Sequence, residues 1–328
     1  MILTKKEISE ITFGALRITE EDGAISFDRF TEGQLDYYEA TNEGYYTRAN
    51  HSASILLDFF TDSEKLSFDY KVTHHAKVES YYFDVYENDM MILHSGHDTV
   101  DVCDGKIEVA LSKGIKRVRV YFPFSQKAHV WNFTLDDGAA VIKRERALKA
   151  LVLGDSITQG YHAKYPSLSY SNLMIERYSF DFVNQAIGGE RFNADMLGDT
   201  KIIEPDVITV AMGINDWVSY KFDEIEKNAD KYFSTLKTLY GNVPIIYISP
   251  IWIDREGNDT MLLATIEMLE SVAISYGAYV IHGLDLVPHD KGMFSDGVHP
   301  TDLGFSEYAK RLFPRMDSII ESIKKLTA

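Results

Sequence analysis

The chain changes its hydrophobic period near residue 145, and this change limits the folds that its two halves can adopt. Before that point, short apolar runs rich in aromatic and branched side chains are separated by turn residues. Such runs at a spacing of roughly 8–12 residues, with almost no helical stretch, are typical of an antiparallel sandwich or jelly roll. The runs expected to form strands are 54–60, 66–72, 81–87, 91–94, 106–111, 117–122 and 129–135. Residues 1–143 are therefore predicted to form an all-β sandwich domain.

From residue 144 onward, short apolar runs alternate with longer amphipathic segments. This alternation predicts a parallel sheet with helices on both faces for residues 144–328. The runs expected to form strands are 148–153, 181–184, 207–212, 244–249 and 278–281. The segments expected to form helices are 225–240, 260–276 and 301–325, where an interruption at Pro314 stays open. Ligands of such sheets bind at the carboxyl ends of the strands, so the informative residues should follow the strands.

Length, charge and cysteine content restrict the partners of the chain. Its 328 residues favour two domains. A net charge of −17 argues against nucleic acids and anionic membranes, and it is compatible with a neutral ester. One cysteine, Cys103, permits no disulfide within the chain.

No apolar stretch approaches the roughly 18 residues of a membrane span. The first residues lack the apolar core of a secretory signal, which favours the cytoplasm. Two alternatives stay open: an export signal removed before this numbering, and assembly into a homo-oligomer.

The first informative block is the run 154–160, which follows the strand predicted at 148–153. It contains Ser156, which opens onto the end of the strand and the start of a helix. Backbone N–H groups at such a turn can face an anion. A plain strand–turn–helix with a capping serine is an equal alternative for this block alone. Because Asp155 precedes the serine, the run is not the Gly-x-Ser-x-Gly elbow of other hydrolases.

Two further blocks follow the next two strands. Gly189 lies in the run 184–190, where a glycine lets the backbone approach a ligand closely and present its N–H group. Asn215 lies in the run 213–216, where its amide could donate a hydrogen bond to developing negative charge. A tight turn and a helix cap are the respective structural alternatives.

The fourth block, 295–300, contains Asp296 and His299. A catalytic histidine needs a partner on its second ring nitrogen, which fixes the tautomer and stabilises the imidazolium. A carboxylate three residues upstream in a turn can fold back to supply that partner. An ordinary loop hydrogen bond is the alternative when the block is taken alone.

Together, the four blocks resemble those of the SGNH hydrolases, the GDSL lipase/acylhydrolase family. The similarity covers about residues 147–305, and its first motif is here Gly-Asp-Ser-Ile, with Ile157 where many members have leucine. It implies a flavodoxin-like three-layer domain without a metal or organic cofactor. It also implies roles for individual residues: Ser156 as nucleophile, His299 as base, Asp296 as its acid partner, and an oxyanion hole formed by Ser156, Gly189 and Asn215.

Weaker candidates lie around these blocks. Tyr161 and His162 follow the nucleophile turn, and Trp217 and Trp252 lie near strand ends, so any of them could contact substrate. Packing at the rim or in the core is an equal interpretation of all four. Arg191 could meet a polar substrate group, although a surface salt bridge is the commoner role of such an arginine.

The first half carries two further candidate features. One is a group of metal-ligand types whose spacing matches no strong zinc pattern, and a polar hairpin turn is the favoured alternative. Its members are His74, His75, His94, His97, Asp98 and Cys103. The other is a set of paired tyrosines that could stack on a sugar, for which burial in the sandwich is the favoured alternative. Its members are Tyr37, Tyr38, Tyr45, Tyr46, Tyr81 and Tyr82.

The leading hypothesis is therefore a serine esterase that hydrolyses a small-acyl ester through an acyl-enzyme. A carbohydrate O-acetyl group is the favoured substrate, because some members of the family carry a β-sandwich ahead of the hydrolase domain and deacetylate sugars. An acyltransferase that uses the same residues and a catalytically silent carbohydrate-binding protein stay as alternatives.

Overall fold

The computed structural model describes residues 1–74, 76–254 and 259–327, and the chain divides into two compact units. The first unit comprises Met1–Thr31, Tyr46–Arg146 and Lys164–Ser167, and the second comprises Glu32–Tyr45, Ala147–Ala163 and Leu168–Ala328. The predicted division at residues 143 and 144 is contiguous, whereas these units exchange two segments. Glu32–Tyr45 groups with the second unit, and Lys164–Ser167 groups with the first.

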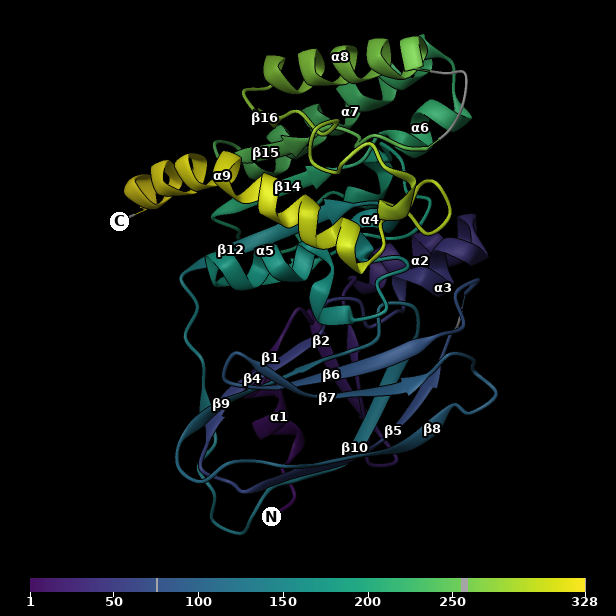
Figure 1. Cartoon of the computed structure of the whole chain (residues 1–328). Coiled ribbons are helices and arrows are strands. Elements are labelled where there is room, and N and C mark those ends of the chain that lie inside the picture. Colours follow the sequence, from purple (N-terminus) through teal and green to yellow (C-terminus); the bar gives the residue numbers. More distant parts are fainter. Residues whose placement is uncertain (75, 255–258, 328) are drawn as a thin grey trace. The chain divides into compact units, whose positions relative to one another are not determined.

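The first unit contains two antiparallel sheets (Figure 1). One has the strand order β2-β3-β10-β5-β8, and the other has the order β1-β4-β9-β6-β7, with β11 paired to β4. The strands are β1 (Thr12–Phe13), β2 (Arg17–Glu21), β3 (Ala24–Asp28), β4 (Leu56–Thr61), β5 (Lys65–Thr73), β6 (Tyr81–Glu87), β7 (Met90–His97), β8 (Asp104–Ala110), β9 (Lys116–Tyr121), β10 (Lys127–Thr134) and β11 (Ile142–Lys143). The predicted β-sandwich is confirmed.

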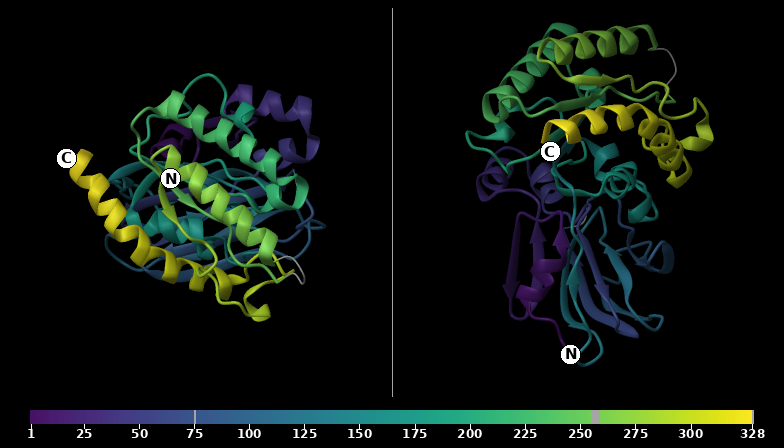
Figure 2. Two further views of the ribbon diagram at one scale, coloured as in Figure 1. Left: turned by 90° about the horizontal axis from the view of Figure 1, so that it is seen from above. Right: turned by 90° about the vertical axis from the view of Figure 1, so that its left-hand side faces the viewer.

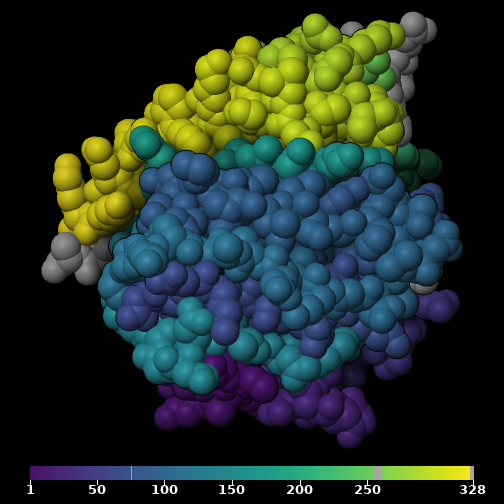
Figure 3. Space-filling model, turned by 60° about the horizontal axis from the view of Figure 1, so that its bottom comes forward, coloured from purple at the N-terminus to yellow at the C-terminus, as the bar shows by residue number. Residues whose placement is uncertain are grey.

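Alternation along these strands builds the core of the sandwich. In β5, the even-numbered residues Leu66, Phe68, Tyr70 and Val72 are buried, while their neighbours are half-buried or exposed. Side chains from both sheets meet in one apolar cluster, where the ring of Phe68 from β5 packs edge-on against that of Phe83 from β6, with centroids 5.7 Å apart. Figure 3 shows an outer face of the molecule, with the N-terminal segment in purple at its edge.

The expected near-absence of helix in the first half is wrong. Three helices occur there: α1 (Lys5–Ile11), α2 (Glu32–Thr41) and α3 (Glu43–Ala49). Thr4 and Glu7 form a capping box at the start of α1, which buries Ile8 and Ile11. In α2 the only buried residues are Gln34 and Tyr38, so this helix shows no clear apolar stripe in the sequence.

The second unit is a three-layer α/β fold. Its sheet is parallel throughout, with the strand order β13-β12-β14-β15-β16. Numbered along the chain, this is the order 2-1-3-4-5 of flavodoxin-like folds, whose switch point lies between the first and third strands. The strands are β12 (Leu148–Gly154), β13 (Phe180–Asn184), β14 (Val207–Ala211), β15 (Ile245–Ile248) and β16 (Tyr279–Ile281). The predicted fold class is confirmed.

Helices cover both faces of this sheet. Figures 1 and 2 show α7 and α8 on one face and α5 and α9 on the other. The helices are α4 (Ser156–Gln159), α5 (Tyr170–Tyr178), α6 (Ile214–Ser219), α7 (Phe222–Tyr240), α8 (Asp259–Ser275) and α9 (Asp302–Thr327), with short 3₁₀ segments at Pro166–Leu168, Ala194–Leu197 and Lys291–Met293. Pro314 lies inside α9, which continues on both sides of it. None of the described helices is both long and apolar enough to cross a membrane.

Candidate active site

The turn that carries Ser156 joins β12 to α4 at the switch point of the sheet. Gly154 ends β12, and a Cβ at this position would collide with the side chain of Thr158. Asp155 caps α4, because its carboxylate accepts a hydrogen bond from the N–H group of Ile157 at 3.0 Å. Ser156 is thus the first residue of α4, and only 5% of it is exposed.

A continuous hydrogen-bonded chain links this serine to a histidine and a carboxylate. His299 Nε2 lies 2.8 Å from Ser156 Oγ, and His299 Nδ1 lies 2.8 Å from Asp296 Oδ2. The other carboxylate oxygen of Asp296 accepts the backbone N–H groups of Val298 and His299 at 3.0 and 2.9 Å. The turn at 295–300 therefore folds the carboxylate back onto the ring, as the spacing suggested.

The hydrogen bonds around Asp296 keep its carboxylate ionised. Partial burial acts to raise the pKa of this group, but the hydrogen bonds from the backbone and ring of His299 lower it to about 2. An ionised carboxylate at neutral pH can hold a proton on Nδ1 of His299 and leave Nε2 as the acceptor for the serine hydroxyl.

Two backbone N–H groups at this site lack a protein acceptor among the described residues: that of Ser156 itself and that of Gly189, which lies in a loop whose other N–H groups are bonded. Between residues 185 and 192, the N–H groups donate to acceptors within the protein, with the exception of Gly189. In the described part of the chain, the N–H groups of Ser156 and Gly189 have no protein acceptor. Gly189 has φ +86°, a left-handed conformation that glycine adopts readily. Unbonded donors of this kind are available to a ligand oxygen.

Asn215 lies beside the same loop, at the start of α6. Its Nδ2 donates to the carbonyl oxygen of Glu190 at 3.0 Å, which fixes the orientation of the amide. A carboxamide has two donor hydrogens, so one remains for a ligand. The side chain of Asn215 and the loop of Gly189 thus hold each other in place.

Sequence reasoning did not foresee that α2 and α3 would support this loop. The hydroxyl of Tyr45 donates to the carbonyl oxygen of Gly189 at 2.6 Å. Tyr38 is fully buried, and its hydroxyl donates to the carboxylate of Glu190. Gln34 exchanges hydrogen bonds of 2.9 and 2.8 Å with the side chain of Gln185. These partners lie about 150 residues away in the sequence, so local patterns carry no signal for the contact.

Removing the hydroxyl of Tyr45 should weaken catalysis without affecting substrate binding. Tyr45→Phe frees the carbonyl of Gly189, so the peptide that presents the N–H group loses one restraint. We expect kcat for p-nitrophenyl acetate to fall about tenfold with little change in KM, less than the 10²–10³-fold loss typical of a deleted oxyanion donor. Tyr37→Phe is the matched control, because the Tyr37 hydroxyl bonds Asn193 at 3.3 Å rather than Gly189. Equal losses in both variants would contradict this role of Tyr45.

Three buried carboxylates lie behind the site. Burial raises the pKa of both Asp155 and Asp216 to about 7, although backbone N–H groups counteract it. Burial likewise raises the pKa of Glu190, against the hydrogen bond from Tyr38. Asp216 accepts the N–H group of Phe192 at 3.1 Å, and its second oxygen is buried without a hydrogen-bond partner among the described residues.

This arrangement predicts that stability changes with pH through Asp216. Its pKa is higher in the folded state than in the unfolded chain, so the folded protein binds more protons between about pH 4 and pH 7. The free energy of unfolding should therefore fall as pH rises through this range. Asp216→Asn removes the ionisation, and its stability relative to wild type should rise by up to about 1.4 kcal/mol per pH unit. Urea unfolding from pH 4 to pH 8 measures this difference. Asp199→Asn, an exposed change, should track wild type at every pH.

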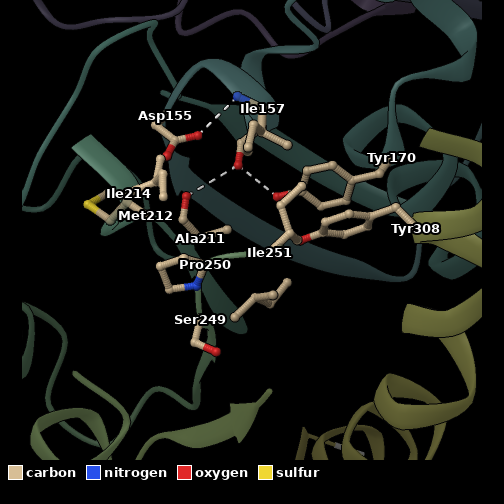
Figure 4. Close-up of a pocket in the computed structure, with 12 residues that line it drawn as sticks. Asp155, Ile157, Tyr170, Ala211, Met212, Ile214, Ser249, Pro250, Ile251 and Tyr308 are labelled. Carbon is tan, nitrogen blue, oxygen red and sulfur yellow. Dashed lines mark hydrogen bonds between the residues drawn. The ribbon is translucent and has the colours of Figure 1, made fainter. Parts of the chain in front are cut away.

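A small cavity lies under the turn that follows β12, between the ends of β12, β14 and β15 (Figure 4). Its volume is about 20 Å³, which holds about one water-sized group. The hydroxyl of Thr158 lies 2.7 Å from the hydroxyl of Tyr170 and 3.5 Å from the carbonyl oxygen of Ala211.

The weaker candidates occupy different places. The ring of Tyr161 lies 5.0 Å from that of His299, and the ring of His162 lies 5.3 Å from it. Trp217 packs against an apolar cluster of Ile214, Ile253, Leu262 and Ile266. Trp252 stacks on His289 and lines a separate cavity of about 210 Å³ with Leu262, Leu263 and Leu284.

Arg191 lines another cavity, of about 250 Å³. Its guanidinium lies over the ring of Tyr220 at 5.2 Å, so it takes part in a cation–π contact rather than in the expected kind of surface salt bridge.

Some members of the two candidate features of the first half take part in packing and hydrogen bonds. His94 Nδ1 lies 2.7 Å from the buried carboxylate of Asp84. The paired tyrosines include two fully buried members, Tyr38 and Tyr81. His75 lies outside the described residues. Among those that the structure describes, the only cluster of three histidine, cysteine or carboxylate ligands is His162, Asp296 and His299.

Comparison with known proteins identifies the second unit. Residues 152–306 match the GDSL-like lipase/acylhydrolase family, a span that contains Ser156, Gly189, Asn215, Asp296 and His299. The chain carries a domain of this family. The predicted resemblance to the SGNH hydrolases is thereby confirmed for residues 152–306, which form a domain of the GDSL-like lipase/acylhydrolase type. A comparison with curated proteins finds no significant match.

Several solved structures share the fold of this chain over most of its length. The salicylyl-acyltransferase SsfX3 from a tetracycline biosynthetic pathway is 18% identical, with a TM-score of 0.79 and coverage of 94% of each chain. A family two carbohydrate esterase from Clostridium thermocellum, in complex with cellohexaose, is 12% identical, with a TM-score of 0.66 and coverage of 94% of this chain and 98% of that one. An acetyl xylan esterase from Butyrivibrio proteoclasticus is 15% identical, with a TM-score of 0.58 and coverage of 81% and 90%.

Proposed function

We propose that this SGNH/GDSL hydrolase is a serine esterase that cleaves a small-acyl ester, with an O-acetylated carbohydrate as the favoured substrate. The observation that carries the proposal is the unbroken chain of hydrogen bonds from Asp296 through His299 to Ser156, each 2.8 Å long. A serine hydroxyl is a weak nucleophile near neutral pH unless a positioned base removes its proton. This chain provides such a base.

Acylation starts when Ser156 Oγ attacks the ester carbonyl. The serine proton passes to Nε2 of His299, and the imidazolium so formed is stabilised by the carboxylate of Asp296 on Nδ1. The carbonyl oxygen becomes an oxyanion, which accepts hydrogen bonds from the N–H groups of Ser156 and Gly189 and from the amide of Asn215. His299 then gives its proton to the leaving alcohol oxygen as the ester bond breaks.

Deacylation repeats these steps with water. The acyl group is now an ester of Ser156, and His299 is again neutral. A water molecule loses a proton to Nε2 as its oxygen attacks the acyl carbon. The second oxyanion accepts hydrogen bonds from the same three donors. Collapse of this tetrahedral intermediate returns the proton to Ser156 Oγ and releases the carboxylic acid. None of these steps requires a metal or an organic cofactor.

Three observations support a small acyl group and a carbohydrate alcohol. The sequence has no long apolar segment that would form a lid over a large acyl pocket. A net charge of −17 favours a neutral substrate over an anionic one. The structures that resemble this chain include an acetyl xylan esterase and a carbohydrate esterase bound to cellohexaose.

A second function is acyl transfer to an alcohol. It is favoured by the likeness to a salicylyl-acyltransferase over 94% of this chain. Both reactions share the same acyl-enzyme, and they differ only in whether water or another hydroxyl takes the acyl group from Ser156.

The test is hydrolysis of p-nitrophenyl acetate, butyrate and octanoate, followed by acetylated xylan, with and without an added alcohol acceptor. We expect the highest kcat/KM for acetate and release of acetic acid from the polysaccharide. Preference for octanoate would contradict the small-acyl proposal. Products that carry the acceptor in place of free acid would favour the acyltransferase.

Absence of turnover together with absence of labelling by a serine-directed phosphonate would contradict both catalytic functions. That result would favour the catalytically silent carbohydrate-binding protein.

A further inference from the structure

His162 gives the proposed triad a second imidazole that its chemistry does not use. His162 Nε2 lies 3.6 Å from Asp296 Oδ2, the oxygen that also faces His299 Nδ1 at 2.8 Å. One atom each of His162, Asp296 and His299 lie within 4.8 Å of one another. All three residues belong to the second unit, so the whole cluster lies within one compact unit.

The backbone holds His162 in this place. Its φ is +67°, in the left-handed region that few residues other than glycine occupy, and it follows the left-handed Gly160 that ends α4. A non-glycine residue in this region carries strain that the surrounding structure must offset, and such residues cluster at functional sites. The turn after α4 therefore directs this ring toward the carboxylate of Asp296.

The donor set matches a borderline transition metal. Two imidazoles and one carboxylate are ligands that Zn²⁺ takes, at about 2.0–2.2 Å, so neighbouring donors around one tetrahedral ion lie about 3.3 Å apart. The distances from Asp296 Oδ2 to His299 Nδ1 and to His162 Nε2 are 2.8 and 3.6 Å, one below and one above that value. The side chains of His162, Asp296 and His299 are 32%, 43% and 16% exposed, so an ion can reach them from solvent.

We propose that His162, Asp296 and His299 form a Zn²⁺ site that reversibly switches off the nucleophile. Zn²⁺ takes Nε2 of His162, Oδ2 of Asp296 and Nδ1 of His299, and water completes the tetrahedron. The proton that His299 carries on Nδ1 moves to Nε2, so the ring stays neutral in the opposite tautomer. Nε2 then donates to Ser156 Oγ and cannot accept its proton. The inhibitory part of this proposal rests on the proposed esterase function, whereas the binding part does not.

The experiment measures binding and activity separately. Calorimetric titration of the whole chain with ZnCl₂ should give one site per chain. Saturating Zn²⁺ should lower turnover of p-nitrophenyl acetate on the order of 10²–10⁴-fold, the range that loss of a general base typically costs, and EDTA should restore it. His162→Asn and His162→Gly remove the ligand, and both replacement residues accept a left-handed backbone.

We expect both His162 variants to bind Zn²⁺ at least tenfold more weakly and to lose most of the Zn²⁺ sensitivity, measured as activity with and without the ion for each variant. His282→Asn is the matched control. His282 is not part of this cluster, and its Nδ1 lies 2.7 Å from the carboxylate of Glu270. It should bind and respond like wild type.

Unchanged Zn²⁺ affinity in both His162 variants, or no binding to wild type, would overturn the site. Binding that depends on His162 without any ester turnover in the wild type would instead count against the proposed function and leave the metal site standing.

Discussion

Ser156→Ala is expected to lower kcat for p-nitrophenyl acetate by on the order of 10⁵–10⁶-fold. The substitution removes the oxygen that would form the acyl-enzyme, and His299 then has no hydroxyl to deprotonate. The oxyanion donors remain, because the N–H groups of Ser156 and Gly189 belong to the backbone. A small rate above that of water should therefore survive.

The fold should tolerate this change. Among the described residues, Ser156 Oγ has one hydrogen-bond partner, His299, and that ring keeps its bond to Asp296. We expect the melting temperature to stay within a few degrees of wild type, which circular dichroism measures. Ser275→Ala is the matched control, since its exposed hydroxyl bonds only a carbonyl within α8 at 2.7 Å, and it should keep full activity. Retention of more than about one hundredth of the activity in Ser156→Ala would place the nucleophile elsewhere.

The change of hydrophobic period was enough to predict both architectures. Buried parallel strands such as Leu148–Gly154 are apolar along nearly their whole length, and β5 alternates with a period of two. These patterns are visible because they arise from burial itself. The predicted strand runs 81–87 and 91–94 pair through a tight turn, in which Asn88 adopts φ +51°.

The missed elements have weaker or different signals. The hairpin of β2 and β3 turns at Asp22 and Gly23, both with positive φ, and an Asp-Gly pair is itself a hairpin signal that could have found it. The helices α2 and α3 gave no such signal, because their tyrosines pack against the loop of Gly189 instead of forming a regular apolar stripe. Contacts across about 150 residues of sequence arise from tertiary packing, which outweighs local preference.

The residues of the candidate site also fall into a group that sequence patterns predict and a group that they do not. Four blocks after four strands identified Ser156, Gly189, Asn215 and the Asp296–His299 pair, because parallel strands bring their carboxyl ends to one edge. Their hydrogen bonds support those roles without testing them. Tyr45 could not be assigned from sequence, since the role predicted for it depends on one carbonyl oxygen that only the folded chain brings near.

Asp296→Asn should lower kcat about 10⁴-fold while leaving the geometry nearly intact. One oxygen of Asp296 already accepts two backbone N–H groups, from Val298 and His299. In the variant, the amide oxygen will keep these two bonds, because an NH₂ group cannot accept them. The NH₂ group is then left facing Nδ1 of His299, where it donates. This arrangement favours the tautomer with its proton on Nε2, which cannot deprotonate Ser156, and it also removes the charge that stabilises the imidazolium.

Kinetics of p-nitrophenyl acetate hydrolysis will measure this loss, with Asp290→Asn as the control. Asp290 has a similar local role, since its carboxylate accepts the N–H group of Gly292 at 2.7 Å in the same loop, but it does not contact His299. The control should therefore retain wild-type turnover, while KM changes little in either variant. A loss below about tenfold in Asp296→Asn would mean that Ser156 and His299 act as a dyad, in which the tautomer is fixed by another group.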